Sequence, residues 1–531
     1  MLKPLEVLQS YREHDYTLCD TYDSRLAGNT RPFVVFRDRS WSYDDFKRDY
    51  LATAQLLVSR GIGHGDRVGV MARNNIGHLL MLFACARIGA IMVPANPDLL
   101  AAEAGYIFRH AGVSAVACDK NLLPVVREAC QPVAPTPWFV LFESADIDAP
   151  DLMRLINEKP QGVLPAPAHA DDTCVIIYTS GTTGFPKGAM HSQRNFVTSG
   201  EANVARLWLQ PTERLLTVLP LFHVNALFYS LAGTLAAGAT IIVGEKFSAG
   251  TFWQIAVDTG ATQVNFIDTI GLILKARPRS EFRPEHKIRI VYGARPEEEK
   301  CFREEFGIDN LINGFGMTEI PGIICNPYHG QRKPGSLGPV GCHPDPARPW
   351  AQCRIVDDNG IDLAPEQVGE LWVKHPIVMK GYYRDPGQTR ASFHDEWFMT
   401  GDLMRRDTDG YFYFVTRKKD MIRRRGENIA GAEIDRVIAS HPDVLEVAVV
   451  PVPSEMGEEE ILAAVVARPG ASVTAQAIAE WCADRLAAMK VPRFILFVDQ
   501  LPHTPTFKVA KHVLKSDPTL RSRAVDMQTL S

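Results

Sequence analysis

A short segment rich in hydroxyls and glycines is the most chemically distinctive part of the 531-residue sequence. It begins with the apolar residues 175–178 and continues as Thr179-Ser180-Gly181-Thr182-Thr183-Gly184-Phe185-Pro186-Lys187-Gly188. Backbone N–H groups, hydroxyls and one ammonium in such a loop can surround a polyphosphate. The segment is not a P-loop of the GxxxxGK(S/T) type, because Pro186 stands where the second glycine must be. We therefore expect a phosphate-binding loop of another type; the alternative is a flexible Gly/Thr hairpin.

The pattern along the chain indicates which elements position this loop. Up to about residue 415, short β-branched runs alternate with longer amphipathic stretches; residues 67–71 and 90–94, for example, flank a helical stretch through residues 79–88. This alternation predicts α/β layering with mostly parallel strands. Shorter strands with tight turns near residues 369–373 and 410–415 predict a smaller β-rich subdomain.

Composition limits the class of protein. A chain of this length with 46% hydrophobic and 22% charged residues is too long for one core, so we expect two or more domains. The net charge of −5 and the dispersed Lys and Arg residues argue against a nucleic-acid partner. The ten cysteines are scattered without a C-x-x-C motif, and the N-terminus has no signal-peptide pattern, which predicts a reduced, cytoplasmic protein.

Residues 215–244 contain no Asp, Glu, Lys or Arg, and their number alone would allow a membrane span. They also contain Pro220, His223, Asn225 and two glycines before a β-branched run. We therefore predict a buried helix that ends near Gly238, followed by a strand over residues 240–243, and no integral membrane segment.

Further motifs follow the phosphate loop in a fixed order. They are Phe315-Gly316-Met317-Thr318-Glu319, Thr400-Gly401-Asp402, Arg417 to Asp420, and Thr504-Pro505-Thr506-Phe507-Lys508. Over essentially its whole length the sequence resembles the adenylate-forming superfamily, which includes acyl- and aryl-CoA synthetases, luciferase and peptide-synthetase adenylation domains. Within it, the sequence looks most similar to crotonobetaine/carnitine-CoA ligases, on residues 245–249, 252–253 and 424–428.

The resemblance implies a large N-terminal region of layered α/β subdomains plus the β-rich subdomain, and a small mobile α+β C-terminal domain. A basic run over residues 417–426 fits a boundary near Lys419. The predicted boundaries are residues 1–417 for the N-terminal adenylation domain, 418–420 for the hinge, 421–516 for the mobile domain and 517–531 for a disordered tail.

The resemblance also implies ATP, Mg²⁺ and coenzyme A as ligands. The implied nucleotide contacts are Thr179, Ser180, Gly181, Thr182, Thr183, Gly184, Lys187, Gly293, Ala294, Asn313, Gly314, Phe315, Gly316, Thr318, Asp402 and Arg417. The implied catalytic residues are Lys508, Thr318, Glu319 and His223, with Glu319 as the Mg²⁺ ligand. Lys508 would bridge the attacking carboxylate and the α-phosphate. Phe507 replaces the family's usual glycine, so this loop must run differently or carry strain.

The remaining site residues concern CoA and the acid. Lys419 matches the hinge position, and Arg425, Gly426, Glu427 and Asn428 would line the pantetheine tunnel. His223 and Asn225 would line the acyl pocket, although a lone histidine in an apolar stretch is usually a core residue. Asp268 and Arg295 fall where the family builds this pocket, so Arg295 could bind a second carboxylate or Asp268 a cation. An ion pair that involves no substrate is an equally good interpretation.

We therefore predict an ATP-dependent acyl-CoA ligase for a small or medium organic acid, including a carnitine-like or crotonobetaine-like acid. An aryl-CoA ligase for a benzoate-like or dicarboxylic aromatic acid is one alternative. A non-catalytic nucleotide-binding relative is another, and a luciferase-like monooxygenase is not excluded by the motifs. The acid, ATP and CoA are the predicted partners, and the sequence leaves a homodimer open.

Overall fold

The protein divides into two compact units, which are described separately. Unit 1 comprises Met1–Gln352 and Lys374–Phe398, and unit 2 comprises Cys353–Val373 and Met399–Ser531. The predicted hinge at residues 418–420 lies inside unit 2. The computed structural model describes residues 1–144, 146, 149–179, 186–293, 298–424, 427–454, 459–503 and 509–529, and the side chains of Asp268, Thr269 and Asn428 lie outside this description.

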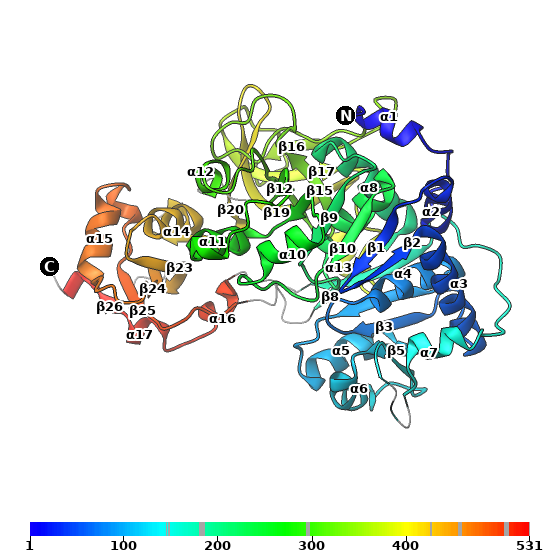
Figure 1. Cartoon of the computed structure of the whole chain (residues 1–531). Coiled ribbons are helices and arrows are strands. Elements are labelled where there is room, and N and C mark those ends of the chain that lie inside the picture. Colours follow the sequence, from blue (N-terminus) through cyan, green and yellow to red (C-terminus); the bar gives the residue numbers. More distant parts are fainter. Residues whose placement is uncertain are drawn as a thin grey trace. The chain divides into compact units, whose positions relative to one another are not determined.

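Unit 1 contains two large, mostly parallel sheets (Figure 1). The first has the order β6 (Trp138–Leu141), β5 (Ala115–Cys118), β3 (Arg67–Met71), β4 (Ile91–Ala95), β7 (Thr173–Thr179) and β8 (Lys187–Ser192). The second has the order β13 (Asn310–Ile312), β12 (Ile290–Tyr292), β11 (Gln263–Asn265), β9 (Arg214–Thr217), β10 (Thr240–Val243), β1 (Pro32–Phe36) and β2 (Arg39–Ser42). The predicted α/β class with mostly parallel strands is confirmed.

Helices connect these strands, as parallel strands require. In chain order they are α1 (Pro4–Gln9), α2 (Leu18–Leu26), α3 (Tyr43–Ser59), α4 (Ile76–Ile88), α5 (Ala101–Ala111), α6 (Leu123–Cys130), α7 (Leu152–Asn157), α8 (Gln193–Leu207), α9 (Ala232–Ala237), α10 (Phe252–Asp258), α11 (Asp268–Ala276), α12 (Glu299–Glu304) and α13 (Pro386–Ala391). Two strands outside the large sheets, β14 (Gly314–Met317) and β15 (Ile320–Cys325), form an antiparallel hairpin.

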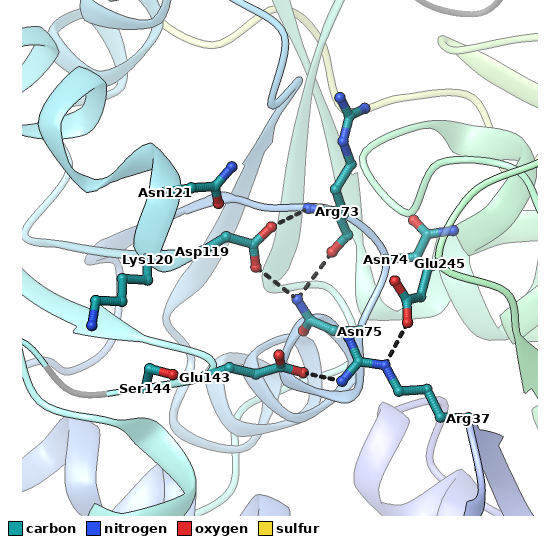
Figure 2. Close-up of a pocket in the computed structure, with 10 residues that line it drawn as sticks. All are labelled: Arg37, Arg73, Asn74, Asn75, Asp119, Lys120, Asn121, Glu143, Ser144 and Glu245. Carbon is teal, nitrogen blue, oxygen red and sulfur yellow. Dashed lines mark hydrogen bonds and ion pairs between the residues drawn. The ribbon is translucent and has the colours of Figure 1, made fainter.

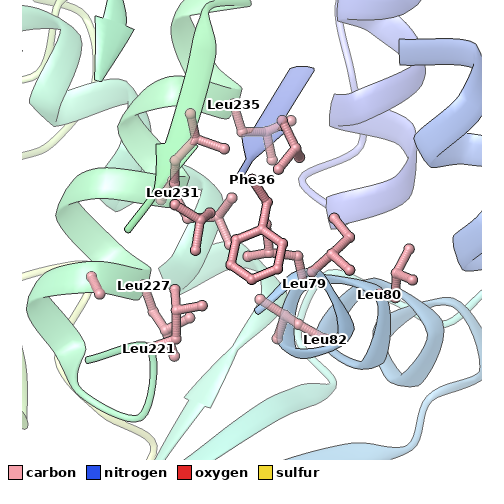
Figure 3. Packing of buried hydrophobic residues seen from close by; sticks show 14 of the residues in the cluster. Phe36, Leu79, Leu80, Leu82, Leu221, Leu227, Leu231 and Leu235 are labelled. Atoms are coloured by element: carbon pink, nitrogen blue, oxygen red, sulfur yellow. The ribbon is translucent and has the colours of Figure 1, made fainter. Parts of the chain in front are cut away.

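Helix α4 lies between the two large sheets and forms the centre of the core (Figure 1). Asn75 caps its first turn, and Gly89 ends it in the left-handed conformation with φ of 75°. All of its residues except Arg87 are buried, which is typical of a helix covered on every side. Leu79, Leu82 and Phe36 pack with leucines of the following segments, including Leu227 and Leu231 (Figure 3).

A π-helical segment, η2 (Asn225–Leu231), leads into α9 and carries Asn225 at its start. Such wide turns release backbone carbonyls from the regular ladder. The carbonyl of Phe228 accepts hydrogen bonds from Asn203 Nδ2 at 2.9 Å and from Ser199 Oγ at 3.2 Å, both on α8. Gly200, also on α8, allows the close approach, because a Cβ there would lie 2.2 Å from the carbonyl oxygen of Ala232.

The uncharged segment 215–244 is therefore divided among β9, η2, α9 and β10, and the predicted helix and strand are confirmed. In the described part of the chain, no helix combines the length and apolar character needed to cross a membrane.

Unit 2 combines a β-rich part with an α+β part. The first contains β16 (Gln352–Val356), β17 (Val368–Lys374), β19 (Trp397–Arg406) and β20 (Phe412–Arg417). Strand β18 (Phe393–His394), which pairs with the first two residues of β19, belongs to unit 1. The second contains the hairpin β21 (Met421–Arg424) and β22 (Glu427–Ala430), the sheet β23 (Val444–Pro453), β24 (Glu459–Ala467), β25 (Phe494–Phe497) and β26 (Val525–Asp526), and helices α14 (Gly431–Ala439), α15 (Ala475–Ala483), α16 (Lys511–Lys515) and α17 (Leu520–Arg523).

The C-terminal residues differ from the predicted disordered tail. Strand β26 pairs with β25, and Arg493 forms an ion pair with Asp526 at 2.8 Å. Leu520 is buried against the same sheet. The polar composition after residue 517 concealed these anchors.

We predict that Gly200→Ala destabilises unit 1. The new methyl group would force apart α8 and the junction of η2 with α9, and such overpacking costs about 1–3 kcal/mol. Thermal unfolding followed by circular dichroism should show a lower midpoint. The matched control is Gly63→Ala, where an added Cβ meets no atom within 4 Å. Equal midpoints for the two variants would contradict the packing argument.

Candidate functional site

The predicted Mg²⁺ ligand lies at the tip of the β14–β15 hairpin. Met317 pairs with Ile320, so Thr318 and Glu319 form the two-residue turn between the strands. The glycines of this motif allow close backbone packing, because a Cβ at Gly316 would lie 2.3 Å from the backbone nitrogen of Gly322. The chain thus presents a hydroxyl and a carboxylate side by side at one turn.

Glu319 is held at both its backbone and its side chain. The backbone N–H of Met379 donates to the Glu319 carbonyl oxygen at 2.8 Å. The Tyr382 hydroxyl donates to Glu319 Oε1 at 2.8 Å, and the Glu319 residue is only 6% exposed. Residues 379–383, which we call the strap, therefore fix the orientation of Glu319.

The strap also pairs with β8, the strand that begins at Lys187. Gly381 and Lys380 exchange backbone hydrogen bonds with Met190 at 3.0 and 2.8 Å, and the N–H of Tyr383 donates to Gly188 at 2.8 Å. The Lys187 ammonium lies 5.5 Å from the centre of the Tyr382 ring. One short segment thus connects two residues predicted to neutralise charge on ATP.

A buried histidine on β8 provides a third attachment. His191 is fully buried, and its Nε2–H donates to the Thr318 carbonyl oxygen at 2.7 Å. Burial disfavours the imidazolium and lowers the pKa of His191 to about 4, so the ring is neutral near pH 7. Sequence patterns did not indicate His191 or Tyr382, because their partners are distant along the chain.

The phosphate segment begins as predicted. Apolar strand β7 ends at Thr179, which pairs with Lys187, so β7 and β8 form a hairpin around the predicted loop. The structure brings the ends of the loop together and places Lys187 beside the strap. Ser180, Gly181, Thr182, Thr183 and Gly184 lie outside the described residues.

Other predicted nucleotide contacts follow neighbouring parallel strands. Gly293 comes directly after β12 and Asn313 directly after β13, and these strands pair with Tyr292 opposite Ile312. In α/β proteins, ligands bind at the carboxyl ends of parallel strands. Gly293 has φ of 91°, and a Cβ there would lie 2.4 Å from the Phe266 carbonyl oxygen. Gly314 and the half-buried Phe315 begin β14, whereas Ala294 lies outside the described residues.

In unit 2, the predicted ribose ligand is part of a braced turn. Asp402 pairs with Arg417 across β19 and β20, and their side chains approach to 3.4 Å. Asp402 is 2% exposed. Glu370 accepts the Gly401 N–H at 3.1 Å and contacts the Lys418 ammonium at 3.2 Å. Glu370 thus connects the turn before Asp402 with the residue after Arg417, and sequence patterns did not indicate it.

The predicted hinge forms a 3₁₀ turn, η5 (Lys418–Asp420). Lys515 donates to the Lys419 carbonyl oxygen at 3.1 Å and to Asp420 Oδ1 at 2.6 Å. Burial, followed by the charge of Arg417, lowers the pKa of Lys419. Ion pairs therefore hold the predicted hinge on each side of Lys419: Lys418 pairs with Glu370 and Asp358, and Lys515 pairs with Asp420.

The two C-terminal motifs are described only in part. The backbone N–H of Ala510 donates to the Pro502 carbonyl oxygen at 2.7 Å. Lys508 lies outside the described residues. Arg425 and Gly426 also lie outside, whereas Glu427 and Asn428 begin β22 opposite Arg424 and Arg423.

The predicted acyl-pocket residues belong to unit 1. His223 and Asn225 are half-buried at the start of η2, and the rings of Phe222 and His223 lie 4.4 Å apart. Asp268 begins α11, although its side chain is outside the description. Arg295 lies outside the described residues.

A polar cavity of about 420 Å³ lies elsewhere in unit 1 (Figure 2). Its lining residues are Arg37, Arg73, Asn74, Asn75, Asp119, Lys120, Asn121, Glu143, Ser144 and Glu245. Arg37 bridges Glu143 and Glu245 across it. None of the predicted site residues that the structure describes lines this cavity.

Comparisons with known proteins agree with this arrangement. The chain matches the family model for AMP-binding enzyme over residues 25–383 and that for AMP-binding enzyme C-terminal domain over residues 433–508. It is 34% identical to a sulfoacetate–CoA ligase of Cupriavidus necator over 501 residues, 91% of this chain and 94% of that protein. It is 31% identical to a crotonobetaine/carnitine–CoA ligase of Escherichia coli over 489 residues, 90% of this chain and 93% of that protein. The solved structure of ATP-bound MatB from Rhodopseudomonas palustris superposes with a TM-score of 0.86 at 27% identity, covering 94% of this chain and 98% of that one.

The layered α/β sheets of unit 1, together with the smaller α+β part of unit 2, are the fold of adenylate-forming enzymes. The chain belongs to the family of AMP-binding enzymes. The predicted family and fold class are confirmed, and so is the prediction of an AMP-forming acyl-CoA ligase, a class that uses ATP and CoA.

We predict that Glu370→Gln loosens the turn before Asp402. The substitution removes the charge opposite Lys418 at a site where Glu370 is 9% exposed. Hydrogen exchange of a peptide spanning residues 399–420 should accelerate about fivefold, since a bond to a charged group contributes at least about 1 kcal/mol.

The control for this prediction is Asp358→Asn, which removes the other partner of the same ammonium. Asp358 is 87% exposed, so exchange should change less than about twofold. Equal exchange rates in the two variants would show that Glu370 does not brace this turn.

Proposed function

We propose that this CoA ligase activates a small organic acid that carries a second polar or charged group. The acid carboxylate attacks the α-phosphorus of ATP to form an acyl-adenylate and release pyrophosphate. The CoA thiol then displaces AMP to form the thioester. The observation that carries the proposal is the fixed turn at residues 318 and 319, which presents Glu319 together with the nearby ammonium of Lys187.

The size and charge of the acid are supported by the named relatives. Sulfoacetate carries a sulfonate and crotonobetaine a quaternary ammonium, and both are short acids. Arg295 is the residue we propose to bind a second anionic group, and Asp268 the residue to bind a cationic one. The acids in the names of these two relatives carry second groups of opposite charge. Whether Arg295 or Asp268 binds the second group of the acid therefore decides the substrate class.

The described donor set suits Mg²⁺ that arrives with the nucleotide. Mg²⁺ is usually bound through one or two carboxylates together with substrate phosphates. No three His, Cys, Asp or Glu residues gather as a ready metal site in the described segments, whereas Glu319 offers a single oriented carboxylate. We propose Glu319 as this ligand; the metal would neutralise phosphate charge.

The chain's own groups would do the rest of the adenylation chemistry. Lys187 would offset charge on the outer phosphates, and Asp402 would accept hydrogen bonds from the ribose hydroxyls. Lys508 would offset the charge that develops between the acid and the α-phosphate. His223 and Asn225 would line the acid site, and Arg425, Gly426, Glu427 and Asn428 would contact CoA. The cytoplasmic location, the mobile C-terminal domain and a homodimer remain predictions.

A panel of acids tests the proposed substrate class. Purified enzyme with ATP, Mg²⁺ and CoA should release AMP fastest with short acids that carry a second charge, and slowly with benzoate and palmitate. The same panel with Arg295→Ala and Asp268→Asn should identify the discriminating residue, because only one variant should lose the preferred acid. Turnover of palmitate or benzoate that is faster than turnover of the short charged acids would overturn the proposed substrate class. Fastest turnover of benzoate would favour an aryl-CoA ligase.

We predict that Lys508→Ala lowers acid-dependent pyrophosphate exchange into ATP by about 10²–10³-fold, the scale for loss of one preorganised electrostatic donor. Lys300→Ala, which removes an 83% exposed ammonium, should leave exchange unchanged. If Lys508→Ala retained full exchange, the assigned role of this lysine would be wrong.

A further inference from the structure

Tyr382 contacts two charged groups that the proposed function uses. Its side chain donates to Glu319 through the hydroxyl and lies beneath the Lys187 ammonium through the ring. The residue is 8% exposed. A cation within about 6 Å of an aromatic ring centre is attracted to the ring face. One buried side chain therefore links the carboxylate and the ammonium.

The backbone holds Tyr382 firmly in this position. Residues on both sides of it exchange backbone hydrogen bonds with β8, and its own N–H donates to Thr389 Oγ1 at 2.9 Å. An ionised carboxylate can only accept hydrogen bonds, so the phenol hydroxyl is the donor in its contact with Glu319.

A glutamate at a two-residue turn has several side-chain rotamers, and binding a metal requires one of them. Fixing a flexible side chain costs free energy at the moment of binding unless the protein has already fixed it. The Tyr382 hydroxyl occupies one carboxylate oxygen and so selects an orientation before ATP arrives.

We propose that Tyr382 is a positioning residue of the adenylation site: its hydroxyl orients Glu319 toward the Mg²⁺ carried by ATP, and its ring supports Lys187. This inference rests on the proposed function, which assigns Glu319 to the metal and Lys187 to the phosphates.

The neighbouring Tyr383 offers a matched control. It lies in the same strap, and its hydroxyl donates instead to the carbonyl oxygen of Ala111 at 3.3 Å. Removing either hydroxyl deletes one oxygen atom from the same short segment. Only the hydroxyl of Tyr382 reaches a carboxylate predicted to bind metal.

The test is calorimetric titration of ATP into the full chain, with Mg²⁺ and with chelator. Wild-type protein should bind ATP more tightly with Mg²⁺. In Tyr382→Phe, the increase in ATP affinity caused by Mg²⁺ should be about five- to tenfold smaller, because a hydrogen bond to a charged group is removed. The ATP affinity without metal should be unchanged. Tyr382→Leu should also weaken metal-free binding, by about two- to fivefold, because Lys187 loses the ring. Tyr383→Phe should behave as wild type.

A double-mutant cycle separates positioning from general loosening of the fold. In a Glu319→Gln background, Tyr382→Phe should have no further effect on the Mg²⁺-dependent gain, because the oriented carboxylate is already absent. The inference would be overturned if Tyr382→Phe reduced the Mg²⁺-dependent gain in ATP affinity equally in the wild-type and Glu319→Gln backgrounds. It would also be overturned if Tyr382→Phe and Tyr383→Phe behaved alike, or if the ATP affinity of wild-type protein did not respond to Mg²⁺. Melting curves of every variant verify that it is folded.

Failure of the proposed function would look different. In that case wild-type protein would bind ATP, yet no acid in the panel would support pyrophosphate exchange. The binding measurements would still decide the role of Tyr382, because they need neither an acid nor turnover.

Discussion

The fixed orientation of the Glu319 carboxylate is the constraint on which the proposed chemistry depends. ATP brings several negative charges to an acid that is itself negative, so catalysis requires positive charge held in place before the reactants meet. A carboxylate contributes to this only by holding a cation. Three hydrogen bonds, from His191, Met379 and Tyr382, fix the turn that carries it. They come from β8, which precedes the turn in the chain, and from the strap, which follows it.

The rest of unit 1 can be understood as support for these bonds. Strand β8 carries both Lys187 and His191 and pairs with β7, which belongs to a sheet packed on the buried helix α4. The strap adds to the other side of β8. Because the strap pairs with β8 and holds Glu319, a shift of that strand would move the ammonium and the carboxylate together. The relative positions of these charges therefore follow from backbone pairing more than from side-chain flexibility.

The sequence was sufficient for the fold class, for the division of residues 215–244 into helix and strand, and for the family, because these depend on local patterns and ordered motifs. It could not reveal Tyr382, His191 or Glu370, whose importance comes from partners 63, 127 and 31 residues away. It also suggested disorder after residue 517, where buried Leu520 and the pairing of β26 could not be inferred from a polar composition. The roles of Lys508, Arg295 and Arg425 still rest on the sequence.

Acid-dependent exchange of labelled pyrophosphate into ATP by Glu319→Gln tests the central claim most directly, because the amide keeps the size and the hydrogen-bond acceptor but removes the charge. The account predicts a loss of at least about 100-fold relative to wild type, with metal-free ATP binding retained. Exchange at the wild-type rate would show that the oriented carboxylate is not needed for adenylation and would contradict the account.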